Sequence, residues 1–355
     1  MLRVPGRAHF GLGLTDPGQP HTRSGERLRD QAQGHGTLRL DRLSGAAALI
    51  TGGAGFIGSA LVRLLAERGY AVRVFDDLST GSVANLESTD AELVEGDVRN
   101  EPALERAAAG SEIVFHLAAG TGVVPSIEDP FADFDLNARG TLCALWAARK
   151  AGARRLVFSS SNAPLGAGAY PASEEKPMAP LSPYGAGKAA GEAYCSAFHG
   201  AYGLDAVAVR FSNGYGPRSG HKSNVIPVFI RRLLAGEELV VYGDGTQTRD
   251  FVYVTDLADG LLRAAETDGI GGEVFQLASG VETSINDLVA RLEGISGREA
   301  HVRREPPRPG EILRNYSLID KARDRLGYGP RVQLEDGLHQ TYDWFTQESA
   351  ARSSR

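Results

Sequence analysis

The feature that most constrains the fold is a glycine loop between an apolar run and an amphipathic segment. Residues 47–50 are apolar, and the loop that follows carries glycines at 52, 55 and 58, in the spacing G-x-x-G-x-x-G. Apolar residues then recur at helical spacing up to residue 68. Glycine permits a tight turn and lets backbone N–H groups approach a pyrophosphate, at which the helix directs its positive end. The alternative is a plain tight turn, but a strand before the loop and a helix after it favour a dinucleotide site.

The remainder of the chain alternates between short apolar runs and helical stretches. This alternation predicts an α/β fold with a doubly wound parallel sheet of the Rossmann type, covered by helices on both faces. The predicted strands after residues 47–50 are 72–75, 92–95, 113–116, 156–159 and 206–211, and 141–151 is a predicted helix. The second half predicts a smaller α/β substrate-binding lobe, with helices at 225–234 and 284–292 and a strand at 238–242.

These patterns also predict the domain boundaries. We expect an NAD-binding domain at 45–211 to which 249–268 return, a nucleotide-sugar lobe made of 212–248 and 269–347, and a disordered leader at 1–44. An alternative for the leader is a start codon placed too far upstream.

Composition excludes several classes of function. The net charge of −6 argues against nucleic acid as a partner, and no apolar run is long enough to cross a membrane. Two cysteines, Cys143 and Cys195, do not make a disulfide framework in 355 residues, so we expect a reducing, cytoplasmic compartment. We expect no metal site.

An acid follows the glycine loop at the end of the second predicted strand. Asp76 lies near the spacing of roughly 20 residues expected for an acid that binds the adenosine ribose. Its carboxylate would accept hydrogen bonds from the ribose hydroxyls and repel a 2′-phosphate, which favours NAD over NADP as the cofactor. The neighbouring Asp77 is expected to be a solvated turn residue.

A tyrosine and a lysine stand four residues apart at a predicted helix start. Ser182 is expected to cap this helix and Pro183 suits its first position, so Tyr184 and Lys188 lie on one face. A phenol is a poor base at neutral pH, but an ammonium and the positive nicotinamide lower its pKa. The pair is therefore a candidate base and its activator, although an amphipathic surface pair has the same spacing.

Three serines end the fifth predicted strand, where its carboxyl end opens onto the cofactor crevice. A hydroxyl among Ser159, Ser160 and Ser161 can bridge the tyrosine and a sugar. We expect one or two of them to cap the following turn instead.

Together with these elements, further motifs resemble the extended short-chain dehydrogenase/reductase family, in its nucleotide-sugar epimerase/dehydratase branch. The resemblance extends over residues 46–345. The matching pieces are Gly96-Asp97-Val98, Phe115–Ala119, Asn137–Thr141, Arg210–Asn213, Tyr242–Gly245, Thr248–Val252 and Arg308–Glu311.

The resemblance implies residue roles at the matching positions. It implies a catalytic set of Tyr184, Lys188 and Ser161. It implies NAD binding by Gly52, Gly55, Phe56, Ile57, Gly58, Asp76, Asp97, Val98, Leu117, Ala118, Ala119, Asn137, Ser159, Tyr184, Lys188 and Phe211. It implies substrate binding by Ser160, Ser161, Asn213, Arg218, Asn224, Val225, Tyr242, Arg249, Arg308 and Glu311. It further implies a homodimer formed through the helices that carry Thr141 and Tyr184.

The residues after Ser161 narrow the reaction within this branch. Dehydratases that resemble this region carry an Asp-Glu pair there, and uronate decarboxylases a glutamate at the second position, whereas this chain has Asn162-Ala163. The resemblance then implies a 4-epimerase that acts through a transient 4-keto UDP-sugar, with Tyr184 moving the proton of the 4-hydroxyl. The alternatives are a decarboxylase, a dehydratase, an NADPH-consuming 4-ketoreductase, or a non-catalytic NAD-binding protein.

The sugar itself stays open at this point. The family usually has Val-Tyr-Gly where this chain has Pro164-Leu165-Gly166, and Thr121 stands where some epimerases have a lysine. Basic residues at 218–222 would suit the carboxylate of UDP-glucuronate or face solvent, so neutral UDP-glucose stays a candidate.

Overall fold

A parallel sheet of seven strands organises the larger part of the chain. The computed structural model describes residues 45–167, 170–307 and 312–353, so the predicted leader lies outside the described residues. The sheet order is β11-β6-β5-β4-β1-β2-β3, and all neighbouring strands run parallel. The strands are β1 (Ala47–Thr51), β2 (Ala71–Asp76), β3 (Glu92–Glu95), β4 (Ile113–His116), β5 (Arg155–Ser161), β6 (Asp205–Phe211) and β11 (Val274–Leu277). The predicted doubly wound fold is confirmed.

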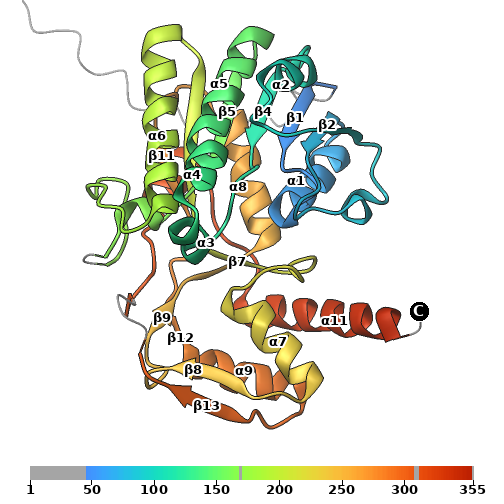
Figure 1. The fold of residues 1–355 in the computed structure, drawn as a ribbon, viewed down its shortest axis with the longest axis vertical. Helices are drawn as coiled ribbons and strands as arrows, with labels where there is room; N and C mark the ends of the chain where they lie inside the picture. Colours follow the sequence, from blue (N-terminus) through green and yellow to red (C-terminus); the bar gives the residue numbers. More distant parts are fainter. Residues whose placement is uncertain (1–44, 168–169, 308–311, 354–355) are drawn as a thin grey trace, which may run out of the picture. The chain divides into compact units, whose positions relative to one another are not determined.

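Alternating strand residues divide the core between the two faces of the sheet, because successive side chains of a strand point to opposite sides. In β1, Ala48 and Ile50 pack in one apolar cluster and Leu49 in the other. Helices α1 (Phe56–Glu67) and α8 (Val254–Glu266) pack together on the first face, and α10 (Asp320–Leu326) joins them. The second face is covered by α2 (Glu101–Ala108), α5 (Gly140–Ala151) and α6 (Pro183–Tyr202) (Figure 1).

A second core builds the smaller lobe. Three helices pack on one another there, and the parallel pair β8–β13 joins their cluster through β8 (Figure 1). The helices are α7 (Val225–Ala235), α9 (Ile285–Ser296) and α11 (Leu334–Ser353), and the strands are β8 (Leu239–Tyr242) and β13 (Val302–Glu305). Two further pairs are the parallel β7 (Asn213–Tyr215) with β10 (Phe251–Tyr253) and the antiparallel β9 (Thr248–Arg249) with β12 (Thr283–Ser284).

One predicted boundary is wrong. The sequence placed 269–347 wholly in the lobe, but β11 pairs with β6 as an edge strand of the main sheet, and α10 contacts β11 and α8. The return to the main sheet therefore extends past residue 268. The pairing is between strands far apart in sequence, so local patterning carries no signal of it.

Three short segments connect β4 to α5 beside the carboxyl edge of the sheet. They are α3 (Val123–Glu128), α4 (Pro130–Asp133) and a π-helical segment (Phe134–Arg139) that continues into α5. All three contact α6. Short 3₁₀ turns at Val83–Leu86 and Ala163–Leu165 complete the described elements.

Candidate active site

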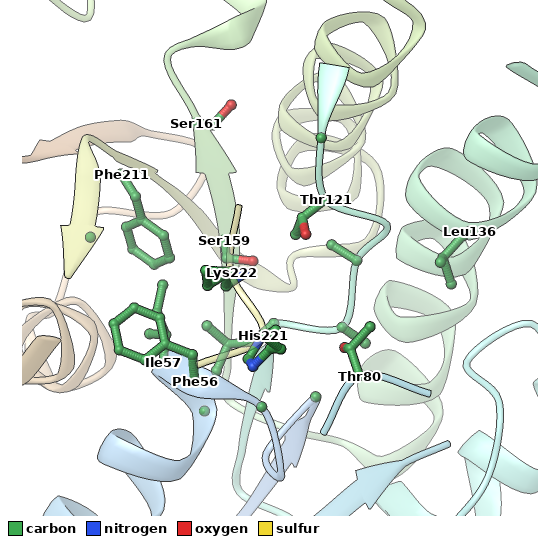
Figure 2. Close-up of a pocket in the computed structure, with 18 of the residues that line it drawn as sticks. Phe56, Ile57, Thr80, Thr121, Leu136, Ser159, Ser161, Phe211, His221 and Lys222 are labelled. Carbon is green, nitrogen blue, oxygen red and sulfur yellow. The ribbon is translucent and has the colours of Figure 1, made fainter. Parts of the chain in front are cut away.

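A cavity of about 530 Å³ lies at the carboxyl edge of the sheet, where the strand order reverses between β1 and β4. Open α/β sheets bind ligands at such a switch point. Figure 2 shows Ser159 of β5, Thr121 after β4, and His221 and Lys222 before α7 around this cavity. The predicted residues that line it are Gly52, Gly55, Phe56, Ile57, Gly58, Asp76, Val98, Leu117, Ala118, Ala119, Ser159, Ser160, Ser161, Tyr184, Lys188, Phe211, Asn213 and Asn224.

The glycine loop is shaped by close backbone packing. Gly52 has φ +72°, and a Cβ there would lie 2.6 Å from the backbone nitrogen of Ala118. A Cβ on Gly58 would collide with the carbonyl oxygen of Gly52. Gly55 precedes α1 without a side-chain cap, so the first N–H groups of that helix lack intrahelical acceptors and lie at the cavity wall. The loop therefore offers backbone donors and a helix dipole to an anion.

Asp76 is fixed at the end of β2 by two backbone donors. Its Oδ2 accepts from the N–H of Ala54 at 2.9 Å and its Oδ1 from that of Leu78 at 2.9 Å. Burial raises the pKa of Asp76, and these two hydrogen bonds oppose the rise. Each oxygen keeps a lone pair for a hydroxyl donor. Asp77 lies on the exposed rim of the cavity and accepts from Ser79.

Tyr184 lies in the first turn of α6, on the helix face that carries the candidate catalytic pair. Ser182 caps this helix by accepting from the N–H of Gly185 at 3.1 Å, and Pro183 occupies the first turn, as predicted. Burial raises the pKa of Tyr184, a hydrogen bond with Ser161 opposes the rise, and the charge of Asp133 adds to it. The protein alone therefore keeps the phenol protonated, and the positive charge of a ligand would be needed to favour the phenolate.

Lys188 lies one turn further along α6 and is 3% exposed. Its Nζ donates to the carbonyl oxygen of Ser159 at 2.8 Å. Burial lowers the pKa of Lys188 to about 7, while the carboxylate of Asp133 counteracts this effect. The ammonium is thus held against β5 and titrates near neutral pH.

The three serines have different partners. Ser159 donates to the carbonyl oxygen of His116 at 3.1 Å, and Ser160 donates to Oε1 of Glu192 at 2.5 Å. Ser161 accepts from the N–H of Ala163 at 3.1 Å, which is the expected turn cap, and also bonds Tyr184. Because the Ser160 hydroxyl proton is used by Glu192, only its oxygen is left for a substrate; Ser161 is the serine placed beside the phenol.

A second cavity of about 390 Å³ adjoins the first, sharing Val123, Ser161, Phe211, Ser212 and Asn213 with it. It extends away from the glycine loop. The other residues that line it are Asn162, Ala163, Gly166, Tyr170, Leu181, Ser182, Ile312 and Asn315. Ser161 therefore stands at the junction, with the cofactor-type cavity on one side and room for a second ligand on the other.

Some residues that were predicted to bind the cofactor or the substrate lie outside both cavities. Asp97 is engaged by the Arg99 guanidinium in a forked ion pair, and Asn137 donates to Gly120 and Asp133. Arg249 donates to the carbonyl oxygens of Thr248 and Ile312. Arg218, Val225 and Tyr242 also line neither cavity. Their contacts with ligands stay predictions, and Arg308 and Glu311 lie outside the described residues.

Other residues at the site were given no role by the sequence analysis. Val123 and Ser212 line both cavities, and Ser223 lines the first. Asp133 and Glu192 act on Lys188 from outside the cavity lining. Glu192 is four residues after Lys188, a spacing that places it on the same helix face, whereas Asp133 has no motif that distinguishes it.

Comparison with known proteins decides the family. The sequence model of the NAD dependent epimerase/dehydratase family matches residues 48–278. The chain belongs to this family. The epimerase/dehydratase assignment agrees with the extended short-chain dehydrogenase/reductase resemblance and with the observed sheet.

Two relatives and one solved structure match this chain over nearly their whole length. A UDP-glucose 4-epimerase of Mycolicibacterium smegmatis is 39% identical, over 85% of this chain and 99% of its own. A dTDP-glucose 4,6-dehydratase of Streptomyces niveus is 35% identical, over 85% of this chain and 93% of its own. The crystal structure of a UDP-glucose 4-epimerase with UDP-glucose from Thermotoga maritima has a TM-score of 0.81 and 37% identity, over 85% of this chain and 99% of that one.

NAD is the cofactor of this family, and the residues present fit it. The glycine loop presents unpaired helix N–H groups for a pyrophosphate, and Asp76 presents carboxylate lone pairs for a ribose. Lys188 and Tyr184 line the same cavity. None of the helices in the described ranges is long and apolar enough to span a membrane. The cytoplasmic location and the homodimer stay predictions.

Proposed function

We propose that this protein is a UDP-sugar 4-epimerase that interconverts UDP-glucose and UDP-galactose. The observation that carries the proposal is the hydrogen-bonded pair of Ser161 and Tyr184 at the junction of two cavities, with Lys188 one helical turn away. The two relatives named above as UDP-glucose 4-epimerases, at 39% and 37% identity, support the UDP-hexose substrate.

The reaction requires one group that removes a proton and later returns it. Tyr184 takes the proton of the 4-hydroxyl, and Ser161 holds that hydroxyl and the phenol in line. Lys188 stabilises the phenolate that must form, and the positive charge of a bound nicotinamide would add to this effect. NAD, when bound, would supply the acceptor and the donor of the C4 hydride and would be regenerated in each turnover. After the sugar has presented its other face, Tyr184 returns the proton to O4.

The lining of the second cavity disfavours dehydration. Elimination of water from the sugar needs an acid and a base beyond the tyrosine, and the positions after Ser161 are Asn162 and Ala163. Asn162 donates to the hydroxyl of Ser317 at 2.9 Å and cannot act as a base. Asp76 and Asp77, the acidic residues among the described lining of either cavity, belong to the glycine-loop end.

The same lining favours a neutral sugar over a uronate. None of the described residues that line the second cavity carries a charge, so a carboxylate buried there would find no ionic partner among them. His221 and Lys222, which the sequence offered to a uronate, line the first cavity instead, and Arg218 lines neither. The sugar assignment therefore rests on the uncharged wall beside Ser161.

Turnover of UDP-glucose and UDP-glucuronate by the purified protein, followed by proton NMR at C4, tests this assignment. We expect kcat/KM for UDP-glucose to exceed that for UDP-glucuronate by about tenfold or more, since an unpaired buried charge costs more than a neutral group. An equal or higher value for UDP-glucuronate would contradict the neutral-sugar assignment. A 4-keto-6-deoxy product would contradict epimerisation itself.

A further inference from the structure

A buried carboxylate outside both cavities faces the catalytic helix. Asp133, the last residue of α4, is 8% exposed. Its Oδ1 accepts from Nδ2 of Asn137 at 2.7 Å, and within the described part of the chain its buried Oδ2 has no hydrogen-bond partner. A buried, unsatisfied carboxylate oxygen is costly, so its retention in a tightly packed position requires a compensating interaction.

The packing places this oxygen against α6 at Gly187, a residue that lies between Tyr184 and Lys188 in the sequence. A Cβ built on Gly187 would lie 3.3 Å from Oδ2 of Asp133 and 3.0 Å from Cβ of Asn137. Gly187 thus lets the helix backbone approach the carboxylate closely, one residue before Lys188. Asn137 belongs to the π-helical segment that follows Asp133. Its Nδ2 also donates to the carbonyl oxygen of Gly120 at 3.1 Å, and this second hydrogen bond holds the Asn137 side chain in place.

We propose that Asp133 is a positioning residue that sets the charge of the catalytic pair, by presenting an unpaired carboxylate oxygen to the helix face that carries Tyr184 and Lys188. This proposal rests on the roles given to these two residues above. The carboxylate favours the ammonium of Lys188 and disfavours the phenolate of Tyr184 until a ligand supplies positive charge. It therefore holds the pair as lysine cation and neutral phenol in the protein alone.

The electrostatics around the pair agree with this role. Asp133 raises the pKa of Lys188, which burial lowers to about 7, and it also raises the pKa of Tyr184. The other charges that act on Lys188 are Lys222 from the segment before α7, which lowers its pKa, and Glu192 on α6, which raises it. Glu192 is already paired with Arg210 of β6. His116 of β4 is buried and its pKa is lowered to about 3, so it adds no charge at neutral pH.

The sign of the effect on pH dependence follows from these directions. Removing the carboxylate lowers the pKa values of both Lys188 and Tyr184. The acid limb of the activity profile, where the phenolate is lost, and the alkaline limb, where the ammonium is lost, should both move to lower pH. A residue that only packs α4 against α6 would change the height of the profile and leave its position unchanged.

The test uses Asp133→Asn in the NAD-loaded protein, with Asp135→Asn as matched control. Asp135 lies two residues further on, in the π-helical segment, and its substitution makes the same chemical change, but its carboxylate is about half exposed and pairs weakly with Arg139 at 3.7 Å. We expect the ratio of kcat at pH 6 to kcat at pH 9 to rise by about tenfold in Asp133→Asn and to be unchanged in Asp135→Asn. An unshifted profile in Asp133→Asn would overturn the proposal.

A second readout does not depend on the substrate. The tyrosinate absorbance of each protein is titrated against its Tyr184→Phe derivative, so that the difference reports Tyr184 alone. We expect this titration to move to lower pH in Asp133→Asn. If the Tyr184 titration moves while no UDP-sugar is turned over, the proposed function fails, but the electrostatic coupling between Asp133 and Tyr184 stands. If the titration does not move, this coupling is wrong whatever the substrate.

Discussion

Replacing Tyr184 with phenylalanine is expected to lower kcat by about 10²- to 10⁴-fold, the usual contribution of a positioned proton-transfer group. The ring stays in place, but the hydroxyl that bonds Ser161 is lost, and nothing at this position can take the proton of the sugar. NAD should remain bound, because the glycine loop and Asp76 are unchanged. The measurement is kcat together with the NAD content of the purified variant.

Tyr194→Phe on the same helix is the matched control. Tyr194 is 37% exposed and lines neither cavity, so its variant should retain wild-type kcat and NAD content. A Tyr184→Phe protein as active as Tyr194→Phe would remove the proposed base from the mechanism.

The second large effect concerns stability. We expect Glu192→Ala to lower the free energy of unfolding by about 3–5 kcal/mol, because it leaves a buried guanidinium without its partner. Arg210 and Glu192 side chains are 2% and 1% exposed, and two hydrogen bonds of 2.9 and 2.7 Å join them. Glu192 also accepts from Ser160, so the substitution loosens the junction of α6 with β5 beside Ser160 and Ser161.

Denaturant unfolding of the NAD-loaded protein measures this effect, and a surface pair provides the comparison. Glu335 bonds Arg291 at 2.8 Å, but both side chains are nearly half exposed, so Glu335→Ala should cost less than about 1 kcal/mol. Equal losses of unfolding free energy in the two variants would show that burial does not make the Glu192–Arg210 pair more important for stability than an exposed pair.

The parts of the site that depend on local sequence were predictable. The glycine loop and Asp76 follow from spacing between a strand and a helix, and Tyr184 and Lys188 from an i, i+4 relation behind a capping serine. The parallel sheet and the helices on both of its faces follow from the alternation of apolar strands and helices. Each of these features is encoded in a short stretch of sequence, and the glycine loop, Asp76, Tyr184 and Lys188 all line one cavity in the structure.

Other parts depend on contacts that sequence patterns do not contain. The Gly96-Asp97-Val98 motif does not show that the Arg99 guanidinium engages the Asp97 carboxylate in a forked ion pair. The return of β11 to the main sheet is a long-range pairing. Asp133 was missed because it precedes a π-helical turn, whose altered period breaks the helical register from which facing residues are inferred.

The most direct test of the account follows the hydrogen at C4 of the sugar. UDP-glucose carrying deuterium at C4 is incubated with the NAD-loaded protein in ordinary water, and the UDP-galactose formed is analysed by NMR and mass spectrometry. We predict that the deuterium is retained at C4 of the product, since it leaves and returns as hydride while Tyr184 exchanges only the hydroxyl proton. Product whose C4 deuterium has been replaced by solvent hydrogen would contradict the account.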